Sequence, residues 1–315
     1  MPLTSVQQAI ADKYLECRVL RATGQAYEDL FTDVMTLHDA AFHPVKPQGS
    51  VGDRKNDGFC GIQGKYFQVY APEDLSQKVG DAVTKLETDF AGLLAYWNSL
   101  SPVKEFHFVV NDRFKGTYPP IEAALLKLKK AHGLTECRPF LNCDLMRIIG
   151  QLSDRDLLKI AGHLPSPQDI ADLDFTVFTD VLSHVINHGH AITPGAIMRV
   201  PDFNEKIRLN RISAPVGSLL TAANLQSGAV DGFFNSHGTF SKKAIRDKLA
   251  EIYADCRNAV DCAPPMKGEP GDIIFFSLLE NITPQPVTRH SQDASIVLLA
   301  YFFETCDIYQ DPALL

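Results

Sequence analysis

The sequence lacks the features that mark exported, membrane-spanning or zinc-ribbon proteins. Seven cysteines occur among 315 residues, an odd number with no CxxC pair, which fits buried reduced thiols better than a disulfide framework or a zinc ribbon. The amino terminus, MPLTSVQQAIADKYLEC, has neither the basic region nor the apolar run of a signal peptide. No stretch approaches the roughly 20 apolar residues that span a bilayer. We therefore expect a cytoplasmic protein without a membrane segment.

The chain also lacks an excess of positive charge. Its formal net charge is −8, which argues against a surface that binds nucleic acid everywhere. A local basic groove remains possible, because phosphate binding depends on where the cations lie. Basic residues do gather in the first half, at Arg54, Lys55, Lys65, Lys78, Lys104, Arg113, Lys115, Lys127, Lys129 and Lys130. On charge alone, a groove and an ordinary solvated surface are both open.

No low-complexity tract and no internal repeat interrupts the chain, which is long enough for two folded domains. Apolar spacing predicts two helices on either side of Gly24 and a strand hairpin over 57–70. A long amphipathic helix over 75–97, a strand over 106–110 and a helix over 120–132 are expected next. This order predicts an α/β fold in which helices flank a small mixed sheet.

The second half of the sequence is less transparent. An amphipathic helix over 241–256 has a serine at its expected amino-terminal cap, and the apolar run near the carboxyl end is expected to enter a core. The segment LPSPQD at 164–169 contains two prolines and is the best linker candidate. We therefore predict one domain over 1–165 and a second mixed, mainly helical domain over 166–315.

The stretch GDRKNDGFCGIQGKYFQVYAPED at 52–74 contains the strongest candidate for chemistry. Asp53 and Asp57 lie four residues apart, and Gln68 and Tyr70 follow a hairpin-like run. If Asp57 ends one strand and Gln68 lies on the next, both oxygens point to one sheet edge, with Tyr70 on the same face. Hard oxygen ligands that converge in this way can hold a divalent ion for phosphodiester hydrolysis.

A structural interpretation of the same stretch is also open. Its glycines can simply permit turns, and the two acids can cap those turns through bonds from side chain to backbone. A second candidate, SHVINHGH, places His184, His188 and His190 at a spacing that suits a metal only if the segment is helical. No acid or cysteine lies near enough to complete that set, so a surface turn is the simpler interpretation.

Two parts of the chain resemble known families. GDRKNDGF with KYFQVYAPED is similar to the core motif of PD-(D/E)xK restriction-endonuclease-like effector domains, in the branch fused to ABC-three-component carboxy-terminal domains. Such proteins occur in antiphage systems related to Lamassu. The segment EKIRLN at 205–210, the helix through Ile252 and Tyr253 and the ending YFFETCDIYQ resemble the associated carboxy-terminal domain.

The resemblance implies a Mg²⁺- or Mn²⁺-dependent endonuclease site. Asp57 would be the principal metal-binding acid and Gln68 would occupy the second ligand position through its neutral carbonyl oxygen. Glu28 and Asp53 would add carboxylates. Position 70 departs from the family pattern, because Tyr70 stands where a lysine is expected and a phenol brings no fixed positive charge at neutral pH.

A cation from elsewhere would have to compensate for this departure. The sequence favours Lys78, on the helix that follows the strand, with Lys55 and Lys65 as alternatives.

The resemblance also implies partners and a cellular role. The expected protein is a DNA-cutting effector, held inactive by and activated through an SMC- or Rad50-like ABC ATPase with a small middle subunit, and it can self-associate on activation. A restrained nuclease would bind DNA poorly alone, which suits an acidic chain. The competing hypothesis is a catalytically inactive adaptor that retains the nuclease fold to bind protein or nucleic acid, for which Gln68 and Tyr70 are the sequence support.

Overall fold

The computed structural model describes residues 2–47, 53–167, 170, 173–187, 203–263, 268–305 and 308–310. Gly52, His188 and His190 lie outside these ranges. Contacts divide the chain into two compact units. One is formed mainly by residues 18–160 and the other by 1–17 together with most of 161–315, and the division falls within α1 (Ser5–Arg21). We call them the sheet unit and the helical unit.

The sheet unit is built on one five-stranded mixed sheet in the order β1-β2-β3-β4-β5. The first three strands are antiparallel neighbours, whereas β3, β4 and β5 are parallel. The strands are β1 (His43–Pro44), β2 (Gly58–Cys60), β3 (Lys65–Tyr70), β4 (Glu105–Val110) and β5 (Glu136–Phe140). The mixed α/β class predicted from the apolar spacing is confirmed.

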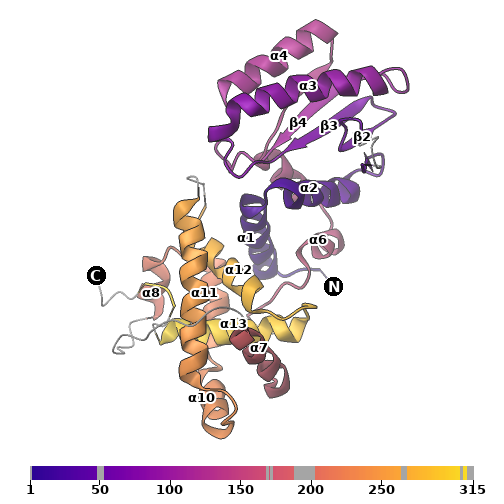
Figure 1. Ribbon diagram of the computed structural model, residues 1–315. Helices are drawn as coiled ribbons and strands as arrows, with labels where there is room; N and C mark the ends of the chain where they lie inside the picture. The colour runs from indigo at the N-terminus through magenta and orange to yellow at the C-terminus, as the bar shows by residue number, and fades with distance from the viewer. Residues whose placement is uncertain are drawn as a thin grey trace. The chain divides into compact units, whose positions relative to one another are not determined.

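Helices cover both faces of this sheet (Figure 1). The helices α3 (Val79–Trp97) and α4 (Pro119–His132) bury Leu86, Phe90 and Leu125 against one face, which includes Tyr66 and Phe106. The helix α2 (Gly24–His38) packs Phe31 against Phe67 and Phe140 on the other face. A 3₁₀ turn, α5 and α6 complete the unit at Ser76–Lys78, Asn142–Ile149 and Asp154–Ala161.

The α3 periodicity illustrates why the sequence folds in this way. Apolar residues that recur every three or four positions give the helix one continuous apolar stripe, and only a sheet face of similar width can bury it. Because side chains alternate along β3, Gln68 and Tyr70 share the α3 face with Tyr66.

Among the described residues of the helical unit, the regular secondary structure is α-helix, which includes the first part of α1. The helix α13 is its centre, with Ile296, Leu298 and Phe302 fully buried, and it packs against α9 and α7. Its burial confirms the core predicted for the apolar run near the carboxyl end. The helices are α7 (Phe175–Asn187), α8 (Phe203–Leu209), α9 (Ala214–Asn224), α10 (Ser227–Ser236), α11 (Lys242–Cys262), α12 (Pro270–Ile282) and α13 (Arg289–Glu304).

Ser241 caps α11 as the sequence predicted, since its side chain accepts a hydrogen bond from the backbone N–H of Ala244. Among the helices in the described ranges, none combines the length and the apolar character that crossing a membrane requires.

A glycine at the start of β2 is required by packing. A β-carbon built at Gly58 would lie 2.3 Å from Cζ of Phe42, which is inside any permitted contact. We expect Gly58→Ala to destabilise the sheet unit by about 1–3 kcal/mol, as overpacked cores do. Gly80→Ala is the matched control, because a β-carbon there meets nothing within 4 Å and alanine favours the helix. Urea denaturation followed by the fluorescence of Trp97, the sole tryptophan, measures both variants. Equal stabilities would contradict the packing argument.

A buried lysine fastens the carboxy-terminal segment of the helical unit. Lys206 is fully buried, and its ammonium donates hydrogen bonds to the backbone oxygens of Phe303, at 2.5 Å, and Ile308, at 2.8 Å. It also lies 4.6 Å from the centroid of the Phe303 ring. Asn210, one helical turn later, bonds Gln310 in both directions.

We expect Lys206→Met to destabilise the helical unit by about 3 kcal/mol, because it leaves two buried carbonyl groups without their donor. Lys243→Met, at an exposed position of α11, should change the stability by less than about 0.5 kcal/mol. Thermal denaturation of the two variants compares them directly, and a tolerated Lys206→Met would show that the ammonium contributes nothing there.

Candidate functional site

Asp57 lies immediately before β2, opposite Gln68 of β3, since Gly58 pairs with Phe67. Its backbone N–H donates to the Phe67 oxygen at 3.1 Å. Its side-chain Oδ2 accepts hydrogen bonds from the backbone N–H of Val69, at 2.6 Å, and from Nε2 of Gln68, at 2.9 Å. The carboxylate thus extends the β2–β3 ladder past its last backbone bond, in a position that is only 5% exposed.

The protonation of Asp57 is strongly perturbed. The pKa of this carboxyl is raised from 3.8 to about 7, chiefly by burial and also by the negative charges of Glu28 and Asp53. The Val69 N–H and the positive charge of Lys85 act in the opposite direction. A carboxyl group that is buried beside other acids gains most from a nearby cation, and such perturbed groups cluster at functional sites.

Gln68 contributes an oxygen without a partner. Its side chain is 3% exposed, and Oε1 has no hydrogen-bond partner among the described residues. A buried amide oxygen left in this state is energetically costly, so its presence needs a reason. A neutral carbonyl oxygen is an acceptable ligand for Mg²⁺.

The two side chains fit part of a magnesium coordination shell. Within the described ranges, no group of three His, Cys, Asp or Glu residues is arranged to hold a metal ion by itself. Mg²⁺ commonly binds through only one or two protein oxygens, with water and substrate phosphates completing six ligands. Asp57 and Gln68 supply a set of that kind.

Glu28 and Asp53 act on Asp57 through charge rather than contact. Glu28 lies on α2 with its Oε1 3.7 Å from Nζ of Lys46. Asp53 accepts a hydrogen bond from the backbone N–H of Lys55 at 2.8 Å, which closes a turn in the loop before β2. The turn-capping interpretation therefore describes Asp53 well, although its charge also reaches Asp57.

Tyr70 and Lys78 lie beyond this pair. The Tyr70 ring stacks on Phe108 with centroids 6.1 Å apart, and burial raises the pKa of its hydroxyl. Lys78 pairs with Asp81, Nζ to Oδ2 at 3.1 Å, and its side chain is 54% exposed. Its charge acts on Tyr70.

One cation that acts on Asp57 was not among the lysines favoured from the sequence. Lys85 of α3 lowers the pKa of Asp57 by its charge, and its Nζ lies 6.0 Å from the centroid of the Tyr70 ring. It forms an ion pair with Asp89, one turn further along the helix. The sequence contained one sign of this cation. Lys85 and Asp89 are four residues apart, and each directly precedes a buried apolar residue of α3.

The two alternative lysines lie in different places. Lys55 pairs with the same acid, with Nζ 2.9 Å from Oδ1 of Asp89. Lys65 lies over the Phe67 ring at 5.4 Å, on the face covered by α2. Lys55 therefore joins the site and Lys65 does not.

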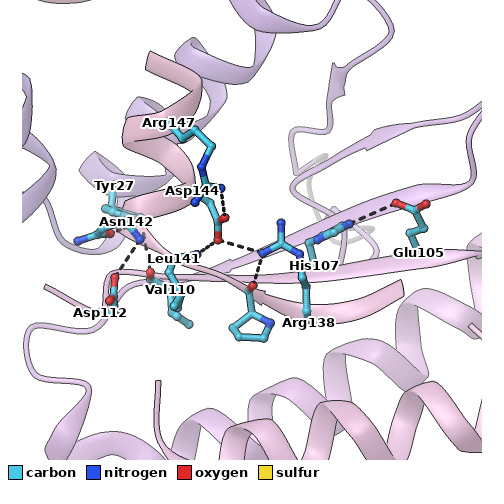
Figure 2. Close-up of polar contacts among 11 residues, drawn as sticks. Tyr27, Glu105, His107, Val110, Asp112, Arg138, Leu141, Asn142, Asp144 and Arg147 are labelled. Atoms are coloured by element: carbon cyan, nitrogen blue, oxygen red, sulfur yellow. Dashed lines mark hydrogen bonds and ion pairs between the residues drawn. The ribbon is translucent and has the colours of Figure 1, made fainter. Parts of the chain in front are cut away.

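A second polar cluster occupies the α2 face and the ends of β4 and β5 (Figure 2). Asp144 accepts hydrogen bonds from Arg138, Arg147 and the backbone of Leu141. Burial alone would raise the pKa of Asp144, but these donors outweigh it and lower the pKa. His107 is buried, and its pKa is lowered to about 3 by this burial and by the positive charges of Lys65 and Arg138. Because the acid is neutralised by two arginines, we assign this cluster to holding α5 against the sheet.

The histidine candidate is only partly described. His184 lies on α7, and a ring nitrogen is 3.1 Å from the backbone oxygen of Asn281 on α12. His188 and His190, which would complete that set, lie outside the described residues.

Comparison with known families gives a match in the helical part of the chain. Residues 178–310 match the family model of C-terminal domain 10 of the ABC-three component (ABC-3C) systems. The match begins within α7 and extends to the end of the described residues, and it supports the carboxy-terminal half of the resemblance noted in the sequence. Comparisons with curated proteins and with solved structures gave no match.

Proposed function

We propose that the chain is a divalent-metal-dependent DNA endonuclease that acts as the effector of an ABC-three-component defence system. The observation that carries this proposal is the buried pair of Asp57, whose pKa is raised to about 7, and Gln68, whose Oε1 has no hydrogen-bond partner in the part of the chain that the structure describes. The ABC-3C match supports the system context. The restriction-endonuclease-like fold and the similarity to Lamassu effectors are part of the proposal.

The chemistry follows from the side chains around that pair. Asp57 and Gln68 would hold Mg²⁺ or Mn²⁺, and the ion would supply a concentrated positive charge that polarises the scissile phosphate and activates water. Lys85 carries the fixed positive charge that Tyr70 lacks, and it can stabilise charge that develops on the phosphate. The Tyr70 hydroxyl can donate a hydrogen bond to a phosphate oxygen or to the attacking water. Glu28 and Asp53 reinforce the local negative charge that favours a cation.

Regulation would come from the partners. The helical unit would dock the effector to an SMC- or Rad50-like ABC ATPase and a small middle subunit, which hold the nuclease inactive until the ATPase responds to foreign DNA. Self-association on activation would bring several sites onto one DNA molecule.

The adaptor hypothesis retains one favourable observation. Asp57 completes the β-ladder by accepting the Val69 N–H, a structural role that needs no metal. An inactive nuclease fold could keep this aspartate for folding alone. The two hypotheses differ in what they predict for a variant that keeps the hydrogen bonds of Asp57 and loses its charge. The nuclease would lose its activity, and the adaptor would not.

A cleavage assay separates them. The full chain, alone and with its ATPase partners, is incubated with linear and circular duplex DNA in Mg²⁺, Mn²⁺ or EDTA. Asp57→Asn retains an acceptor oxygen for Val69 and Gln68 but loses the charge, while Asp81→Asn is the control at an exposed acid of α3. We expect metal-dependent cutting by the wild type and the control only. Absence of cutting in every condition, with an intact partner complex, would favour the adaptor.

A further inference from the structure

Four residues of α3 form one stripe that faces the loop before β2. Lys85, Asp89, Gly92 and Tyr96 follow one another at intervals of four, three and four, so they lie on one side of the helix. Asp89, Gly92 and Tyr96 contact the loop at 53–57, which contains Asp53 and Asp57. Lys85 lies beside Tyr70. We call these four residues the α3 stripe.

Asp89 is the centre of the stripe. This carboxylate is 2% exposed, yet it pairs with two lysines, one on each oxygen. Oδ1 lies 2.9 Å from Nζ of Lys55 and Oδ2 lies 2.5 Å from Nζ of Lys85. A buried carboxylate has little freedom to move, so it fixes both ammonium groups within a few ångströms of one point.

The loop depends on these contacts for its conformation. Arg54 and Lys55 have φ angles of 54° and 65°, a left-handed backbone that side chains other than glycine rarely adopt. The Lys55 stem crosses Gly92, where an added β-carbon would lie 3.1 Å from its Cγ. The Arg54 guanidinium lies 5.0 Å from the centroid of the Tyr96 ring. Three contacts with α3 thus hold a strained turn next to Asp57.

The two lysines retain donors that face water. Their side chains are 49% and 34% exposed, for Lys55 and Lys85 respectively. Each ammonium has three N–H donors, and the ion pair with Asp89 occupies one of them. Two cations with free donors, held by a single carboxylate, leave an excess of one positive charge beside the acids of the site.

We propose that Asp89 positions Lys55 and Lys85 as a paired cationic subsite for a phosphate of the DNA backbone. The subsite rests on the proposed nuclease function for its role in cleavage, but its phosphate binding can be tested separately. Asp89 is a positioning residue in this arrangement, since the lysines and not the carboxylate contact the phosphate. Lys85 belongs to this subsite, and its positive charge also acts on the Asp57 carboxyl group.

Binding is measured first, without cleavage. The full chain is titrated into a fluorescent duplex in EDTA at several salt concentrations, and anisotropy reports the affinity. The double variant, with Lys55→Ala and Lys85→Ala together, should weaken binding at least tenfold and reduce the salt slope by about one, because the contacts to one phosphate are lost. Lys78→Ala, at a cation outside the stripe, should change neither quantity. An unchanged affinity in the double variant would overturn the subsite.

The positioning role of Asp89 is measured by separating binding from turnover. Asp89→Asn removes the anchor and one negative charge, so we expect DNA affinity to be retained while the cleavage rate falls at least tenfold. Asp89→Glu, which keeps the carboxylate, should recover part of that rate. Equal losses of affinity and rate in Asp89→Asn, with unfolding visible by circular dichroism, would assign Asp89 to stability alone and overturn its positioning role.

The outcomes distinguish this inference from the proposed function. If the wild type does not cut DNA but the double lysine variant loses DNA binding, the subsite stands and the nuclease does not. If the wild type cuts DNA and the double lysine variant cuts and binds DNA as well as the wild type does, the nuclease stands and the subsite is wrong. Inorganic phosphate is the third probe: stabilisation of the protein by phosphate through these lysines, without any effect of the lysines on DNA binding, would overturn the assignment to a DNA phosphate.

Discussion

Asp57→Asn is expected to stabilise the protein at pH 8 by as much as about 4 kcal/mol, although it alters the proposed metal ligand. The carboxyl group has a pKa of about 7 in the folded chain, against an ordinary value of 3.8. Each pKa unit corresponds to about 1.4 kcal/mol between the two protonation states, which sets the upper limit. Asparagine removes the buried charge and keeps an acceptor for Val69 and Gln68.

The sign of the pH dependence follows from the direction of the shift. Below about pH 4 the group is protonated in both the folded and the unfolded chain, so Asp57 imposes no penalty. Between about pH 4 and 7 the unfolded chain releases the proton and the folded chain retains it, so the wild type loses stability as the pH rises. Above about pH 7 the loss levels off. The advantage of Asp57→Asn should therefore be absent near pH 4 and largest at pH 8.

Urea denaturation between pH 4.5 and 8.5 measures this difference. Trp97 lies on α3 and its ring is 5.1 Å from that of Phe59, so its fluorescence reports unfolding of the sheet unit. Asp81→Asn is the control, because this acid is 65% exposed and should leave the pH profile unchanged. If the stabilities of the wild type and Asp57→Asn change in parallel with pH, the pKa of Asp57 is not raised by its surroundings.

The second large effect concerns which lysine supplies the missing charge. We expect Lys85→Met to lower the single-turnover rate of DNA cleavage by about 100-fold or more, a loss typical of removing one group that stabilises developing charge. Lys78→Met should lower the rate less than about threefold, because Lys78 is exposed and pairs with Asp81. Methionine keeps the length of both side chains, so packing is preserved.

Rate measurements with saturating protein give this comparison without product release. The opposite order, with Lys78→Met inactive and Lys85→Met active, would restore the lysine favoured by the sequence and contradict the charge arrangement described above. Similar small losses in both variants would show that the site works without a lysine on α3.

The sequence predicted most of the sheet unit because its signals are local. The period of α3, the hairpin of β2 and β3 and the apolar strand β4 each depend on residues close together in the chain. The sequence placed Asp57 at the end of one strand and Gln68 on the next only as a condition, and the register of β2 and β3 brings the two side chains within hydrogen-bond distance. Elements of this kind can be predicted before any tertiary contact is known.

The remainder of the site depends on tertiary contacts. Asp89 and Lys85 look like an ordinary exposed ion pair in the sequence of α3, and only the packing of the helix on the sheet brings them to the loop before β2. The raised pKa of Asp57 likewise comes from burial, which one residue cannot reveal. The division of the chain shows the same limit: residues 1–17 group with the helical unit, where Tyr14 packs its ring 5.3 Å from Phe276. The proposed domain ranges of 1–165 and 166–315 remain a prediction.

The central claim is that the buried pair of Asp57 and Gln68 holds a divalent ion. Titration of the full chain with Mn²⁺, followed by electron paramagnetic resonance of the free ion with a short duplex present, measures this directly. We expect one bound Mn²⁺ per wild-type chain, with binding weakened at least tenfold in Asp57→Asn and measurably in Gln68→Leu, which removes the Oε1 that has no partner among the described residues. Equal Mn²⁺ binding by the wild type and Asp57→Asn would contradict the metal site and, with it, the proposed mechanism.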